Sequence, residues 1–148
     1  MTLPTVAVGV GSAADLHARI QQFYTRQMRL LDAGAAQEWA DTFGDDGVFE
    51  QNVDARPLRG RAAIGAAAQR RIDALAADGM VRRHWLGMLQ VHPSTDGTVR
   101  TRYYAFAMAT RSDGRCPIYA STQAEDVLIP VADGWRVSHR TVRHDGVA

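Results

Sequence analysis

Three Asp-Gly pairs in the second half of the chain limit most strongly what it can fold into. They are Asp96-Gly97, Asp113-Gly114 and Asp133-Gly134, and each separates two stretches of extended-type sequence. Asp-Gly is among the strongest short indications of a tight turn between antiparallel strands. We therefore predict an antiparallel meander whose four strands span residues 80–92, 98–111, 115–130 and 135–144.

The first half of the chain has helical periodicity instead. Apolar residues recur at the helical period over residues 14–33, and shorter helical patterns cover residues 35–43 and 61–77. Residues 48–52 are predicted to form a short strand. Helices that precede a run of strands indicate an α+β fold, in which three N-terminal helices pack on one face of a curved antiparallel sheet.

Length and composition restrict the classes of protein to consider. A chain of 148 residues predicts one domain, over residues 14–144, with an N-terminal arm at 1–13 and a C-terminal tail at 145–148. The net charge of +1 argues against a nucleic-acid partner. No apolar run approaches the ~20 residues that a membrane span requires. The start lacks the features of a signal peptide, so we expect a cytoplasmic protein.

Motifs for metals and cofactors are missing from the sequence. A single cysteine, Cys116, excludes an intrachain disulfide and a cysteine-based zinc site. The five histidines show neither a His-x-His pair nor a helical i, i+4 pair. There is no phosphate-binding loop and no dinucleotide fingerprint. We therefore expect neither a metal nor a cofactor.

His84 is the first candidate for chemistry. Strand alternation puts it on one face with Leu86, Met88 and Gln90, so its imidazole is expected in a half-apolar environment. Imidazole is the side chain that gains or loses a proton near neutral pH. The alternative is an ordinary hydrogen-bonded core histidine. The opposite face carries Trp85, Leu89 and Val91, which are candidates for a homodimer interface.

Asp32 is the second candidate, because it closes the first predicted helix. The negative end of the helix dipole disfavours a carboxylate there, which favours a role in proton transfer. An exposed turn residue is the alternative. Two more acids, Glu125 and Asp126, are adjacent in a predicted strand and must point to opposite faces. A buried carboxylate needs a partner or a role, but alternation leaves open which of the two points inward.

Several stretches resemble the SnoaL-like group of the nuclear-transport-factor-2-like superfamily, in order and in spacing. They are Phe23-Tyr24, Arg29-Leu30-Leu31-Asp32, Glu38-Trp39, Phe43-Gly44-Asp45-Asp46-Gly47-Val48-Phe49, Leu58-Arg59-Gly60-Arg61-Ala62-Ala63-Ile64, Arg83-His84-Trp85-Leu86-Gly87, Glu125-Asp126-Val127-Leu128 and Gly134-Trp135-Arg136-Val137. The resemblance covers residues 16–143 and implies a cone-shaped fold. Because this fold hosts many functions, it specifies the activity less well.

Three relatives imply different roles for the same cone. In scytalone dehydratase an aspartate at the end of the first helix and a histidine on the first long strand act on a water, and Asp32 and His84 look like those two positions. That enzyme's second catalytic histidine would fall near residues 107–110, where this chain has none. SnoaL-type polyketide cyclases use a late-strand carboxylate, which would be Glu125 or Asp126. In the small subunits of aromatic-ring dioxygenases the fold is structural.

The resemblance implies a cofactor-free acid/base enzyme that cyclises, dehydrates or isomerises an aromatic polyketide-type intermediate in bacterial secondary metabolism. Asp32 would hold His84, and His84 would move the proton. The alternatives are a non-catalytic binding or scaffolding subunit and an epoxide hydrolase, which needs an Asp–Arg–Asp trio that the sequence does not identify. The expected substrate-binding residues are Tyr24, Trp39, Phe49, Leu86, Met88, Tyr104, Phe106, Gln123 and Glu125, with Phe23 as a further apolar wall.

Overall fold

The structure, a computed structural model, describes residues 12–147. Its elements are α1 (Ala13–Asp32), α2 (Ala36–Ala40), β1 (Phe43–Gln51), β2 (Leu58–Arg59), α3 (Arg61–Ala77), β3 (Val81–Pro93), β4 (Val99–Thr110), β5 (Ile118–Val131) and β6 (Gly134–His144). The predicted arm at 1–13 lies mainly outside the described residues, and Ala13 already belongs to α1. None of the described helices is long and apolar enough to cross a membrane.

The predicted meander forms the larger part of one six-stranded sheet, in the order β2-β1-β6-β5-β4-β3. The glycines of two Asp-Gly turns, Gly97 and Gly114, have φ of +87°, a conformation that glycine adopts without steric cost. The sheet extends beyond the meander, because β1 pairs with β6 and β2 pairs with β1. The β1–β6 pairing is parallel, so the sheet is mixed at this edge.

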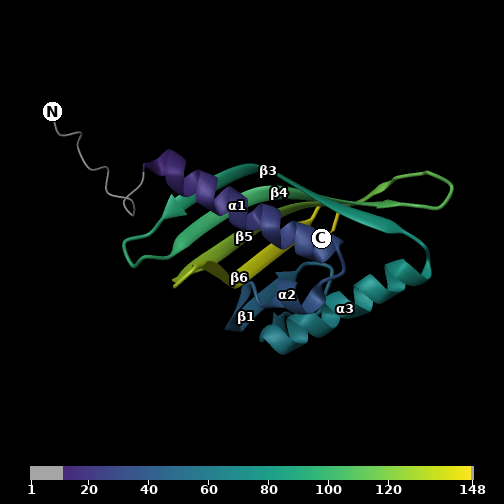
Figure 1. The fold of residues 1–148 in the computed structure, drawn as a ribbon, viewed down its shortest axis with the longest axis horizontal. Helices are drawn as coiled ribbons and strands as arrows, with labels where there is room; N and C mark the ends of the chain where they lie inside the picture. The colour runs from purple at the N-terminus through teal and green to yellow at the C-terminus, as the bar shows by residue number, and fades with distance from the viewer. Residues whose placement is uncertain (1–11, 148) are drawn as a thin grey trace.

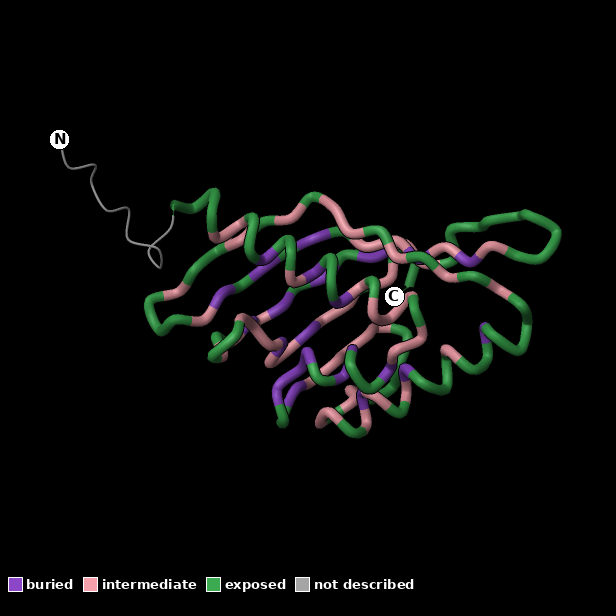
Figure 2. The backbone as a smooth tube through the Cα atoms, in the orientation of Figure 1, coloured by how far each residue is buried: buried purple, intermediate pink, exposed green. Residues whose placement is uncertain are grey.

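The helices cover one face of this curved sheet (Figure 1), which confirms the predicted α+β architecture. The side chain of Ser12 accepts a hydrogen bond from the backbone N–H of Asp15 and so caps α1. The helix then buries Ile20, Tyr24 and Gln27 against the sheet. Buried residues gather along the strands beneath α1, whereas the long turn between β4 and β5 is exposed (Figure 2). The core therefore lies between α1, α2 and the inner sheet face.

A β-bulge in β3 changes which residues of that strand point inward. Gly87 pairs with Tyr104, but the next paired residue is Gln90, so one extra residue is inserted. Met88 has φ of +51° and is 77% exposed. Leu89 is packed against the core instead. The prediction that Met88 shares the inner face with His84 is therefore wrong, because strict alternation assumes an unbroken strand.

The same bulge corrects the predicted interface. Leu89 and Val91 pack on the core and are not available as an outer apolar patch. Trp85 precedes the bulge, keeps its predicted outward direction and is 68% exposed. Of the three residues that the sequence nominated for a homodimer interface, only Trp85 presents its side chain to the outer face of the sheet.

Candidate active site

Asp32 and His84 form a close pair at the end of α1. The Nδ1 atom of His84 lies 2.6 Å from Oδ1 of Asp32, and the backbone N–H of His84 donates to Oδ2 at 3.0 Å. Both side chains are largely buried. A carboxylate only accepts hydrogen bonds, so Nδ1 of the neutral imidazole carries the proton and Nε2 keeps its lone pair. This arrangement can fix the ring and leave one nitrogen as a proton acceptor.

His84 lines a cavity of about 110 Å³ between the helices and the inner sheet face. Three alanines from neighbouring strands, Ala105, Ala107 and Ala124, form part of its wall, and their small size leaves the space open. The wall is mainly apolar, with polar groups from few residues. The other lining residues are Met28, Leu31, Trp39, Phe49, Gln51, Tyr103, Phe106, Thr122, Arg140, Val142 and His144.

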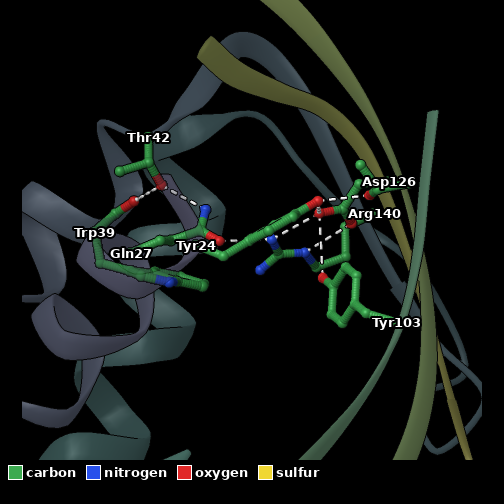
Figure 3. A network of polar contacts seen from close by, with 8 residues as sticks. Tyr24, Gln27, Trp39, Thr42, Tyr103, Asp126 and Arg140 are labelled. Atoms are coloured by element: carbon green, nitrogen blue, oxygen red, sulfur yellow. Dashed lines mark hydrogen bonds and ion pairs between the residues drawn. The ribbon is translucent and has the colours of Figure 1, made fainter. Parts of the chain in front are cut away.

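A buried ion pair between Asp126 and Arg140 lies beside this cavity (Figure 3). The Nε atom of Arg140 donates to Oδ1 of Asp126 at 2.9 Å, and Nη2 donates to Oδ2 at 2.8 Å. The hydroxyls of Tyr24 and Tyr103 also donate to Oδ2, at 2.7 and 3.1 Å. Nη2 makes a further bond to Oε1 of Gln27 at 2.6 Å. Both oxygens of Asp126 thus accept hydrogen bonds, three of them at Oδ2, which favours a structural role over that of a free base.

Burial controls how the groups of this network ionise. It raises the pKa of Tyr24 well above the ordinary value, and the charge of Asp126 adds to the effect. Burial also raises the pKa of Tyr103, with the charge of Arg140 opposing the shift and that of Asp126 adding to it. For Arg140, burial is the largest effect and acts to lower the pKa, but the charge and hydrogen bond of Asp126 together with Tyr103 and Tyr24 outweigh it, so the pKa is raised. At neutral pH the two phenols are therefore hydrogen-bond donors and the guanidinium is charged.

A family model described as SnoaL-like domain matches residues 12–141. The chain belongs to this SnoaL-like family. The match also confirms the cone-shaped nuclear-transport-factor-2-like fold that the sequence predicted. The Asp126–Arg140 pair and the Asp32–His84 pair are thus parts of one SnoaL-like cone.

Solved structures of similar proteins support the assignment along nearly the whole chain. Aln2 from a Streptomyces species is 30% identical over 90% of this chain and 94% of its own, with a TM-score of 0.84. ActVI-ORFA from Streptomyces coelicolor is 28% identical over 91% and 98%, with a TM-score of 0.82. A Catenulispora acidiphila protein solved in complex with S-DNPA is 36% identical over 89% and 95%, with a TM-score of 0.75. No curated protein matches the chain.

The SnoaL-like cone brings together only part of the predicted set of site residues. Four of them line the cavity, namely Trp39, Phe49, His84 and Phe106. Asp32 lies behind His84 and is hydrogen-bonded to it. Leu86 and Phe23 pack against the core, whereas Tyr24 is buried in the Asp126 network. These residues come from α1, α2, β1, β3 and β4, so the fold and not local sequence assembles them.

Four predicted substrate-binding residues lie on the opposite face of the sheet. Met88 is displaced by the bulge, and Tyr104 and Gln123 are exposed and paired with each other across β4 and β5. The Glu125 side chain is 64% exposed and forms an ion pair with Arg102. Their predicted place in the cavity is wrong. In β4, strand alternation turns Tyr104 outward, whereas Tyr103, Ala105 and Ala107 line the cavity.

Tyr103, Arg140 and His144 are among the cavity residues that the sequence reasoning missed. Arg140 could not be found by counting from the Asp133-Gly134 turn, because the count places His139 opposite Asp126, and a register shift between Val127 and Leu128 brings Arg140 there instead. The His144 backbone is held by the side chain of Asn52, which accepts from its N–H at 2.7 Å and donates to its carbonyl at 3.1 Å. No local motif indicates His144, because β1 and β6 are far apart in the chain.

The two buried phenols predict a loss of stability at alkaline pH. Their pKa values are raised in the folded protein above the ordinary value of 10.0. The unfolded chain therefore loses these protons first, and the stability that the phenols supply is present below pH 10 and lost as the pH rises further. We expect the free energy of unfolding to fall by up to about 1.4 kcal/mol per pH unit for each phenol.

Urea unfolding at several values between about pH 9 and about pH 11.5 measures this slope. The chain contains no lysine, which would otherwise titrate in this window. Tyr24→Phe should reduce the slope, whereas Tyr104→Phe, at an exposed position, should leave it unchanged. A free energy of unfolding that stays constant across this range would contradict the buried network.

Proposed function

We propose that this protein is a cofactor-free acid/base enzyme of bacterial secondary metabolism, acting on an aromatic polyketide-type intermediate. The observation that carries the proposal is the 2.6 Å contact between Nδ1 of His84 and Oδ1 of Asp32, with His84 lining a mainly apolar cavity. The complex of the Catenulispora acidiphila protein with S-DNPA supports a small-molecule ligand for a chain of this kind.

The first step of the proposed reaction is proton transfer from a carbon next to a carbonyl group. Nε2 of His84 accepts this proton, directly or through one water, while Asp32 holds the ring and stabilises the imidazolium that forms. The electrons of the broken C–H bond move onto the carbonyl oxygen and give an enolate. Return of the proton to another atom isomerises the substrate. Attack of the enolate carbon on a second carbonyl cyclises it, and the alkoxide that forms takes the proton from the imidazolium. Dehydration breaks the bond to a β-hydroxyl group, which leaves as water with the proton from the imidazolium.

The mainly apolar wall of the cavity beside the pair favours this chemistry. Phe49 and Val142 line the cavity, and an apolar wall strengthens the interaction between the imidazolium and its carboxylate partner. Gln123 and Tyr104, which the sequence predicted to bind the substrate, are on the outer face of the sheet and do not belong to the proposed site. Any stabilisation of the enolate oxygen must come from donors on the inner face.

Hydrogen exchange tests the proposal without knowledge of the final product. Aromatic polyketide-type ketones are incubated with the protein in D2O with no added metal or cofactor, and deuterium at the carbon next to the carbonyl is followed by NMR. We expect incorporation well above the rate without protein, and none above that rate with His84→Gln. Exchange that persists in His84→Gln would assign the base to another residue.

The size of the cavity favours a second candidate function, a non-catalytic binding or scaffolding subunit. A volume of about 110 Å³ is below the several hundred Å³ of a typical small-molecule site, so a multi-ring substrate must extend out of the cavity or widen it. In the same experiment, ketones that bind tightly and show no exchange would favour this candidate. An epoxide hydrolase is not supported, because no acidic residue is among those that line the cavity in the described chain.

A further inference from the structure

The indole of Trp39 carries a buried hydrogen-bond donor that has no acceptor within residues 12–147. Trp39 is 5% exposed, and its Nε1 is the one buried side-chain polar atom of the described residues without a partner. The backbone carbonyl of the same residue is engaged by the hydroxyl of Thr42, so the local structure satisfies the main chain but not the ring. Unpaired buried donors are uncommon in folded proteins and call for an explanation. Trp39 lines the cavity.

Arg140 supplies a second donor at the same cavity. Its Nε and Nη2 atoms donate to Asp126 and Gln27, whereas Nη1 makes no hydrogen bond to any described residue. Figure 3 shows this free end of the guanidinium directed toward the side on which the indole of Trp39 lies. The guanidinium is fixed in place by its ion pair and by the rings of Phe43 and Phe49, which lie 5.3 and 5.9 Å from its carbon.

The other polar groups of the wall leave this pair of donors free for a ligand. Gln51 directs its Oε1 to Nε2 of His144 at 2.9 Å, and the hydroxyl of Thr122 donates to the carbonyl of Ala105. No carboxylate is among the lining residues of the described chain. A ligand that enters therefore meets the side chains of Trp39, Arg140 and His84. An electron-rich oxygen suits the unpaired donors of Trp39 and Arg140 best.

We propose that Nε1 of Trp39 and Nη1 of Arg140 together bind one oxygen of the substrate, and that this oxygen is a phenolate or an enolate. The inference rests on the proposed function, because it assigns the group on which negative charge develops when His84 removes a proton. Arg140 supplies a charge-assisted bond, which strengthens as the oxygen becomes an anion. Trp39 supplies a neutral donor of fixed position, so the two residues set which oxygen of a polyketide-type ring can be held.

Two matched one-ring probes test the oxygen site by binding alone. The probe 4-nitrophenol ionises to a phenolate whose absorbance reports its charge, and 4-nitroanisole has the same ring with a methyl ether. We expect the protein to bind 4-nitrophenol, to raise its ionised fraction at fixed pH, and to bind 4-nitroanisole at least tenfold more weakly. Equal affinity for the two probes would overturn the proposal.

The variant Trp39→Phe removes the N–H and keeps an aromatic ring. Loss of one hydrogen bond should weaken the binding of 4-nitrophenol about tenfold and leave the affinity for 4-nitroanisole unchanged. Trp85→Phe, at the exposed tryptophan of the outer face, is the matched control and should change neither affinity. Unchanged affinity of Trp39→Phe for 4-nitrophenol would exclude the indole from the site.

An NMR measurement on the unaltered protein keeps the test valid if Trp39→Phe does not fold. The chain has three tryptophans and so three indole N–H signals. The indole N–H signal of Trp39 should move downfield when 4-nitrophenol is added and stay in place when 4-nitroanisole is added. A Trp39 signal that does not move with 4-nitrophenol would overturn the proposal. His84→Gln should still bind 4-nitrophenol while it loses deuterium exchange, so failure of the oxygen site and failure of the proposed function give different results.

Discussion

Replacing Asp126 with alanine is expected to lower the free energy of unfolding by about 3–5 kcal/mol, because it leaves a buried charge without its partner. The Arg140 side chain is 3% exposed, and that of Asp126 is fully buried. The substitution also removes the acceptor for the hydroxyls of Tyr24 and Tyr103. Three donors on α1, β4 and β6 would therefore lose the group that connects them, and the helix would lose one of its fixed contacts with the sheet.

Urea unfolding followed by circular dichroism measures this effect, and the neighbouring residue supplies the control. Glu125 precedes Asp126 in β5 but points outward, where its ion pair with Arg102 is exposed. Glu125→Ala should therefore change the free energy of unfolding by less than about 1 kcal/mol. A loss of similar size in both variants would mean that the buried pair contributes no more than a surface pair.

The second large effect is on catalysis, where Asp32→Asn and His84→Gln should each lower turnover by a hundredfold or more. His84→Gln removes the proton acceptor. Asp32→Asn keeps the shape of the side chain, but an amide can donate to Nδ1 and so favour the tautomer in which Nε2 carries the proton. The Asn variant thus presents a donor where the reaction needs an acceptor, although the ring stays close to its place.

Kinetics of the double variant distinguish a catalytic unit from two separate contributions. Residues that act as a unit have non-additive effects, so Asp32→Asn combined with His84→Gln should be about as slow as the slower single variant. His92→Gln is the matched control, because His92 lies in the same strand and is exposed. Turnover close to that of the unaltered protein in His84→Gln would remove His84 from the mechanism.

The sequence predicted most of the elements, because each depends on local chemistry, but it missed β2 and assigned Phe43, the first residue of β1, to the second helix. Residues 61–77 were predicted as a helix and form α3 with the same bounds. The Asp-Gly pairs predicted the three hairpins of the meander, since a turn of this type requires few neighbours to form. The contact between Asp32 and His84 was also predicted as a pair, and the structure brings the two side chains within hydrogen-bond distance.

The rest of the site could not be predicted, because it depends on strand register and on distant parts of the chain. The bulge at Met88 exchanges which residues in the second half of β3 point inward and which point outward. No residue of that stretch indicates the bulge from the sequence. In β4 the wall of the cavity carries Tyr103, Ala105 and Ala107, whereas Tyr104, which was predicted to bind the substrate, points to the other face of the sheet. The bond between Arg140 and Gln27 joins residues 113 positions apart.

The alanines that line the cavity also bear on how such a protein can change over generations. Ala105, Ala107 and Ala124 each end at a methyl group on the wall of an unfilled space. A larger apolar side chain at any of them would fill part of that space and add packing contacts, so mutation toward a more stable protein would tend to close the binding space. The same positions lie outside both the Asp32–His84 pair and the Asp126 network. Exchange of side chains among them can therefore reshape the range of accepted molecules while the proton-transferring groups stay unaltered.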